Sequence, residues 1–189
     1  MVEPYLYLLL TVFFFNLLPA FAPPTWVVLS NFQLSNGFDP FLTIAIGLVG
    51  ALSGRVVMYY YSKHLYPFLP KKKKEKVAKL HKEALEHEED LGLLMFFYSL
   101  GPLPSNVVFI FSGIAKIPLL PVALGFFFGR LISYGVAMFA FDTFLLGLKD
   151  YGINVLPYLD IISLLLTIAI LFVDWDAILR FIRPKQQKG

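Results

Sequence analysis

The placement of charged residues restricts the folds open to this chain more than any other feature. No charged side chain occurs between Glu3 and Asp39 or within residues 91–115, whereas 13 of the 29 charges fall in residues 71–90. A soluble core does not hide neutral stretches of this length, but the hydrocarbon of a bilayer requires them. With 58% apolar residues and a mean hydropathy of +0.70, the sequence predicts an integral membrane protein.

The same features disfavour several classes of soluble protein. The net charge of +3 comes from basic residues that flank apolar blocks, which is the usual orientation signal of membrane proteins, so no nucleic-acid partner is expected. The absence of cysteine excludes disulfides and thiol chemistry. Residues 20–22 imitate a signal-peptide cleavage site, but no Lys or Arg precedes Arg55, so we do not expect a signal peptide.

Hydropathy divides the chain into five apolar blocks, at residues 4–32, 41–62, 91–115, 117–141 and about 153–173. Prolines interrupt two of them: Pro19, Pro23 and Pro24 in the first block, Pro102 and Pro104 in the third. The arms beside these prolines are too short to cross a hydrocarbon core of ~30 Å, which needs about 20 helical residues. We therefore expect an all-α polytopic fold in which 4–32 and 91–115 are re-entrant helical hairpins sheltered by other helices.

The distribution of lysine and arginine predicts the orientation. If all five blocks crossed, the basic run 71–74 and the basic tail 177–189 would face opposite sides, against the positive-inside rule. With two re-entrant hairpins, only helices 41–62, 117–141 and 153–176 cross. The linker 63–90 and the C-terminus are then cytoplasmic, and the N-terminus lies outside.

An internal repeat supports this organisation. The pattern G-x-x-x-G-R-x-x-x-Y occurs at residues 50–59 and 125–134, and Pro24–Val28 resembles Pro104–Val108 upstream. The first copy is longer, which fits a longer loop from Asn31 to Pro40. Repeats 4–62 and 91–142 are thus each a hairpin plus one crossing helix, so the second is inverted relative to the first within a single membrane domain, 1–189. Inverted repeats with broken helices are a recurrent transporter architecture.

The linker 63–90 contains a predicted amphipathic surface helix from Lys71 to Asp90. Its basic end comes first and its acidic end last, which opposes the helix dipole. We therefore assign the lysine run to lipid headgroups.

Two arginines, Arg55 and Arg130, lie inside predicted spans. A guanidinium in the hydrocarbon costs ~2.5–3.5 kcal/mol on insertion scales, so such a residue faces a cavity or a partner. The first interpretation is that the pair binds an anion, above all phosphate, one arginine serving each half of the membrane. The alternative is that each donates to carbonyls freed at a proline-broken tip, or reaches towards an interface.

The predicted substrate site also includes the hairpin tips, because half-helix N-termini near Thr25 and Ser105 can attract an anion. Helix capping is the alternative role for these residues. The tip residues are Asn16, Pro23, Pro24, Thr25, Pro102, Pro104, Ser105 and Asn106. Two small-xxx-small pairs, Gly50/Gly54 and Gly125/Gly129, predict close helix packing.

Acidic residues that could couple transport to protons are few. The candidates are Asp160, in the first turns of the last helix, and Asp142, which ends the preceding span; both are expected near an interface. No catalytic residue, metal site or cofactor is predicted, because no nucleophile accompanies a base and the three histidines match no common metal pattern. We do not expect an enzyme.

Taken together, these motifs resemble the DedA superfamily, membrane proteins that share the VTT domain with eukaryotic lipid scramblases. Residues 16–25 resemble its first proline-rich hairpin, 50–60 its glycine helix, and 100–118 its second hairpin with the following glycine turn. The resemblance implies re-entrant hairpins and the transport or scrambling of lipids, notably polyprenyl phosphates.

The chain departs from this family at several charged positions. The family often has acids where Thr25 and Arg55 stand, and arginines near Ser99 and Asn106. In these departures the chain is similar to a divergent branch whose members are labelled small multidrug exporters. The missing acids place carboxylate-based proton coupling in doubt. Phosphate binding by Arg55 and Arg130 is a hypothesis from this sequence, separate from the resemblance.

Three functions follow as hypotheses. The first is a transporter or flippase of the inner membrane that moves an anionic lipid or small anion between the hairpin tips. The second is a proton-coupled exporter of small compounds, and the third is a non-transporting assembly protein whose basic linker docks a partner or lipid. The expected partners are membrane lipids and an anionic substrate, and an oligomer is compatible with the sequence.

Overall fold

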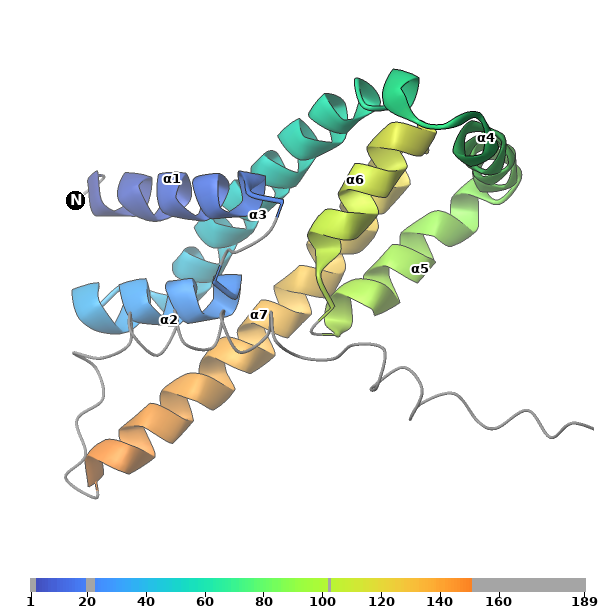
Figure 1. Ribbon diagram of the computed structural model, residues 1–189. Helices are drawn as coiled ribbons and strands as arrows, with labels where there is room; N and C mark the ends of the chain where they lie inside the picture. Colours follow the sequence, from blue (N-terminus) through green and yellow to red (C-terminus); the bar gives the residue numbers. More distant parts are fainter. Residues whose placement is uncertain (1–2, 20–22, 102, 151–189) are drawn as a thin grey trace, which may run out of the picture.

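The computed structural model describes residues 3–19, 23–101 and 103–150 (Figure 1). All regular secondary structure in these ranges is helical, which confirms the predicted all-α class for this part of the chain. The elements are α1 (Glu3–Leu17), α2 (Thr25–Asn36), α3 (Pro40–Lys63), the 3-10 turn η1 (Tyr66–Phe68), α4 (Lys71–Glu86), α5 (Glu88–Leu100), α6 (Ser105–Ala115) and α7 (Leu119–Asp150). The predicted helix 153–176 and tail 177–189 lie outside the described residues.

Prolines separate the helices of two hairpins, α1 with α2 and α5 with α6 (Figure 1). Helix α1 ends just before Pro19, α2 begins after Pro24 and α6 begins after Pro104. Proline cannot continue a helix because its ring clashes with the preceding turn and it has no N–H group. The four hairpin helices have 11 to 15 residues each, fewer than a bilayer crossing needs. Their re-entry into a membrane stays a prediction.

The two long helices, α3 and α7, run in opposite directions across the molecule (Figure 1). The first helix of each hairpin packs against the long helix that follows it, α1 on α3 and α5 on α7. The second helix of each hairpin packs against the other long helix, α2 on α7 and α6 on α3. Each hairpin is therefore held between both long helices.

Glycines allow the first hairpin helices to approach the long helices at backbone contact distance. A Cβ atom at Gly50 would lie 2.8 Å from the carbonyl oxygen of Leu9, and one at Gly54 would lie 2.8 Å from that of Phe13. In α7, a Cβ atom at Gly129 would lie 2.6 Å from the carbonyl oxygen of Phe96. Gly125 faces the carbonyl of Gly92 in the same way. Backbone atoms cannot rotate away as side chains do, so these contacts require small residues.

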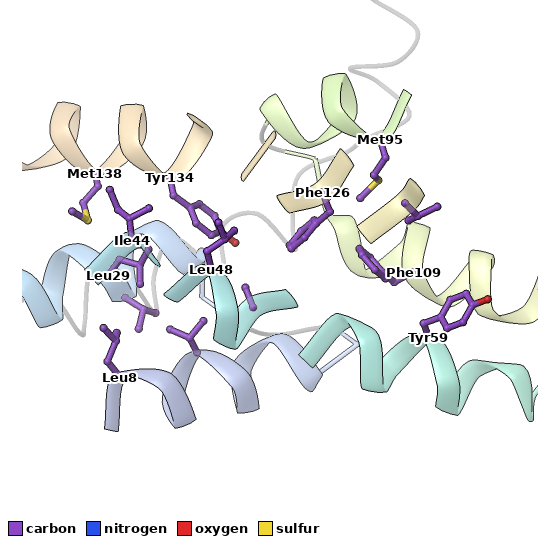
Figure 2. Close-up of a cluster of buried hydrophobic side chains, with 14 residues drawn as sticks. Leu8, Leu29, Ile44, Leu48, Tyr59, Met95, Phe109, Phe126, Tyr134 and Met138 are labelled. Atoms are coloured by element: carbon purple, nitrogen blue, oxygen red, sulfur yellow. The ribbon is translucent and has the colours of Figure 1, made fainter. Parts of the chain in front are cut away.

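The buried core is one cluster of apolar side chains (Figure 2). At one end of the cluster, side chains of α1, α2 and the first half of α3 meet Tyr134 and Met138 of α7. At the other end, α5 and α6 meet the first half of α7 and Tyr59 of α3. The rings of Phe109 and Phe126 pack edge to face there, with centroids 5.3 Å apart.

Helix occupies residues 31–36, where the sequence predicted the start of a loop. Gly37 ends α2 in the left-handed conformation, with φ of 64°, which glycine adopts without strain. Asp39 then caps α3, because its carboxylate accepts a hydrogen bond of 2.8 Å from the backbone N–H of Leu42. Helix α2 is only one residue longer than α6, and most of the extra residues of the first repeat lie in the first turns of α3, before Gly50. The expectation of a loop from Asn31 was therefore wrong.

The linker also differs from its predicted form. Helix α4 ends at Glu86, and Glu88, Glu89 and Asp90 form the first turn of α5 instead of the end of a linker helix. Acidic side chains in a first turn are stabilised by the helix dipole. These three carboxylates were expected to oppose the dipole of a linker helix. In the structure they complement the dipole of α5.

Two described helices, α3 and residues Leu119–Phe144 of α7, are long and apolar enough to cross a membrane. Half of the most apolar stretch in the first and a third of that in the second are buried, so many apolar side chains face outward. By length and composition these helices indicate association with a membrane.

Candidate functional site

The site is centred on Arg55, which follows Gly54 in α3 and is 7% exposed. Its Nη1 donates a hydrogen bond of 2.9 Å to the backbone carbonyl of Asn16. That carbonyl lies in the last turn of α1, where no further turn of helix supplies an N–H partner. The close contact at Gly54 brings the end of α1 within reach of the guanidinium.

Arg130 makes equivalent contacts in the second hairpin. It follows Gly129 in α7, and its Nη2 donates a hydrogen bond of 2.8 Å to the carbonyl of Leu103. Its Nη1 lies 3.4 Å from the carbonyl of Gly101. Each arginine thus bonds to the tip of the hairpin in its own repeat, the arrangement that the sequence offered as the alternative to anion binding.

Polar side chains at the tips connect the helices. The buried amide of Asn16 donates 2.9 Å to the carbonyl of Val12 and 3.1 Å to Oγ1 of Thr25, which joins the end of α1 to the start of α2. The amide of Asn106 donates 2.6 Å to the carbonyl of Pro19. Because Asn106 lies in the first turn of α6 and Pro19 lies at the first tip, the two tips are in contact.

Two of the remaining predicted tip residues, Pro24 and Pro104, accept hydrogen bonds through their backbone carbonyls. Pro23 precedes Pro24, whose carbonyl accepts a hydrogen bond of 3.0 Å from the N–H of Val27 in the first turn of α2. Ser105 is buried at the start of α6. The carbonyl of Pro104 accepts a hydrogen bond of 3.1 Å from the hydroxyl of Tyr98. Pro102 lies outside the described residues.

Arg55 and Arg130 bond to the two hairpin tips, which the hydrogen bond from Asn106 to Pro19 joins. Among the described residues, no carboxylate forms an ion pair with either arginine. The Nε of each is buried without a hydrogen-bond partner. Two uncompensated positive charges with unused donors form a region that favours an anion.

Asp142 lies close to the end of the candidate span Leu119–Phe144, although helix α7 itself continues to Asp150. Its side chain is 8% exposed and lies beside the hydroxyl of Ser30 on α2. Neither the Asp142 Oδ1 nor the Ser30 hydroxyl has a hydrogen bond of good geometry. Asp160, the other candidate acid, lies outside the described residues.

Tyr98 and Tyr134 contact the site, and Tyr59 joins α3 to the residues after α6; none of the three was given a role from the sequence. Tyr98 closes the second hairpin through Pro104, and Tyr134 lies under Arg130, with the guanidinium 5.7 Å from its ring. Tyr59 donates a hydrogen bond of 2.6 Å to the carbonyl of Ile117. The signal for two of them was present, since Tyr59 and Tyr134 are the last positions of the repeated glycine-arginine motif.

Within residues 3–19, 23–101 and 103–150, no group of three histidine, aspartate or glutamate side chains could hold a metal ion. No family model, curated protein or solved structure matches the chain. The resemblance to the DedA superfamily therefore stays a prediction.

Proposed function

We propose that this chain is a membrane transporter or flippase that moves an anionic lipid, such as a polyprenyl phosphate or phospholipid, or a small anion, past the two hairpin tips. The observation that carries the proposal is the pair Arg55 and Arg130, which lack a carboxylate partner among the described residues and keep buried, unused Nε–H groups beside the tips. Guanidinium groups bind phosphate with two parallel hydrogen bonds, so phosphate is the favoured anion.

The hydrogen bonds to the tip carbonyls leave other N–H donors of Arg55 and Arg130 unused. A guanidinium has five N–H donors, and Arg55 uses its Nη1 for the carbonyl of Asn16. An anion that approaches Arg55 competes with that carbonyl for the same charge. Binding would then loosen the hold on the tip, which couples anion capture to movement of the hairpin.

The proposed inverted repeat agrees with the packing of the hairpins. Positions 9, 13 and 16 contact Gly50 and Gly54, whereas positions 92, 96 and 99 contact Gly125 and Gly129. The three positions of the first hairpin have the same spacing as the three of the second. The long helices run in opposite directions (Figure 1). In the proposed topology three helices cross, residues 41–62, 117–141 and 153–176, with the linker cytoplasmic and the N-terminus outside.

The test is lipid translocation in reconstituted vesicles, with labelled phosphatidylglycerol and a labelled polyprenyl phosphate. The Arg55→Gln, Arg130→Gln double variant removes both charges but keeps an amide donor at each position. We expect it to lose most translocation of both anionic lipids. The matched control is Lys72→Gln, Lys76→Gln, which removes two exposed charges from α4. Equal translocation by the wild type and the arginine variant would show the proposal to be wrong.

Buried Asp142 favours a second candidate function, proton-coupled export of small compounds. A buried carboxyl group whose Oδ1 has no hydrogen-bond partner, located where α2 packs on α7, is suited to exchanging a proton. This function requires efflux that is driven by a pH gradient, and the substitution Asp142→Asn should abolish that efflux. Efflux unaffected by that substitution would remove this candidate.

A further inference from the structure

We propose that Lys63, Lys74 and Lys116 form a binding site for the headgroup of an anionic phospholipid. The site lies at the end of α6 opposite to the hairpin tips and does not depend on the transport function proposed above. Its residues come from the end of α3, the first turn of α4 and the residue that follows α6.

Tyrosine rings hold the three ammonium groups, two of them at the same ring. The Nζ atoms of Lys116 and Lys74 lie 5.6 and 5.8 Å from the centroid of one ring, that of Tyr66. The Nζ of Lys63 lies 4.6 Å from the ring centroid of Tyr59. The hydroxyl of Tyr59 bonds to the carbonyl of Ile117, next to Lys116, so α3 is attached to the turn that carries that lysine.

No carboxylate in the described part of the chain forms an ion pair with a lysine of this cluster. The lysine ion pairs there join Lys79 to Glu83 and Lys82 to Glu86. The ammonium groups of Lys74 and Lys116 both lie beside the ring of Tyr66, and their like charges repel each other. An anion near both groups would offset this repulsion. A phosphate group supplies the missing charge and accepts hydrogen bonds from ammonium groups.

The backbone at Lys116 provides a second, independent observation. Its φ is 54°, and it is the one described non-glycine residue with a positive φ. The corresponding residue after α2 is Gly37, with φ of 64°. Glycine takes this conformation freely, whereas lysine is strained in it. At Lys116 the chain thus has a charged side chain where glycine would give a less strained turn.

The surroundings favour a lipid over free phosphate. Lys63 is the last residue of α3, and Lys116 lies just before α7, so the cluster sits at the ends of both candidate spans. Aromatic side chains beside it face outward: Tyr60 is 54%, Tyr61 70% and Phe68 84% exposed. Aromatic residues of this kind gather at the headgroup level of membranes. Free phosphate would leave them in water.

The test measures binding to the full-length protein in detergent. Thermal unfolding midpoints are followed against increasing dihexanoyl phosphatidylglycerol, dihexanoyl phosphatidylcholine or inorganic phosphate. We expect phosphatidylglycerol to raise the midpoint at much lower concentration than the other two. Lys74→Gln and Lys116→Gln should each weaken its apparent affinity about fivefold, and the double variant about 30-fold.

The control is Lys76→Gln, Lys79→Gln, which removes the same charge from exposed positions of α4 outside the lysine run 71–74 and leaves the tyrosine cluster intact. Its affinity should stay within about twofold of the wild type. Any lipid at the hairpin tips contributes equally to all these variants. Equal weakening by the control would overturn the site, as would equal binding of phosphatidylcholine or of inorganic phosphate.

Lys116→Gly separates the lipid role from a structural one. Glycine relieves the left-handed backbone, so the unliganded variant should unfold at a higher temperature than the wild type. It should nevertheless bind phosphatidylglycerol about fivefold more weakly, because the ammonium group is lost. Unchanged affinity in this variant would also contradict the proposal.

Discussion

Arg55 and Arg130 combine two roles that the sequence presented as alternatives. Each side chain donates to carbonyls at a hairpin tip, and each keeps a buried Nε–H without a partner. A residue that only capped a helix would need no lasting charge, because a neutral amide can donate to a carbonyl. Substitutions that remove the donor and the charge separately therefore distinguish the two roles.

At Arg55 the two roles can be separated by stability. Arg55→Ala leaves the carbonyl of Asn16 buried without a partner, which should destabilise the protein by about 2 kcal/mol. Arg55→Gln keeps a donor and should cost less than half as much. Thermal unfolding in detergent measures both. Equal losses for the alanine and glutamine variants would show that the hydrogen bond to the tip contributes nothing.

At the scale of elements, small residues decide how the hairpins meet the long helices. Gly50 and Gly54 lie against α1, and Gly125 and Gly129 lie against α5, in every case at a backbone atom. The regular spacing of these glycines made close packing predictable, because residues four apart share one face of a helix. The sequence did not predict which helix would pack on that face, since local spacing carries no information about the partner helix.

Gly125→Ala should force α5 away from α7, because the added Cβ would meet the carbonyl of Gly92. We expect a loss of about 1–3 kcal/mol in stability, typical of overpacking. The matched control in the same helix is Gly135→Ala, whose Cβ would have no atom within 4 Å. That variant should be neutral or more stable, because alanine favours helix over glycine by up to ~1 kcal/mol. Similar effects of the two substitutions would contradict the packing described for α5.

At the scale of the whole molecule, the contact between the two tips holds the halves of the chain together at the proposed site. The bond from Asn106 to the carbonyl of Pro19 joins residues 87 positions apart. The proposed function requires this contact to open when an anion passes.

A cross-link between the tips tests that requirement. The chain has no cysteine, so Pro19→Cys with Asn106→Cys can be joined by a short bifunctional maleimide. We expect efficient cross-linking and a loss of lipid translocation that is absent in each single cysteine variant treated alike. A cross-linked protein that translocates at the normal rate would show that the tips need not separate.

Proline sterics and hydropathy were sufficient to predict the all-α class, the breaks near Pro19, Pro24 and Pro104 and the apolar character of α3 and α7, because these are local properties of the chain. The continuation of α2 to Asn36 and of α7 past Asp142 was missed, since packing on neighbouring helices extends a helix beyond its local signals. The meeting of the tips, the carbonyl partners of the arginines and the lysines gathered around Tyr66 exist only in the folded chain. They join residues from different helices, and pairings over such distances depend on how whole helices pack, which no local pattern of residues encodes.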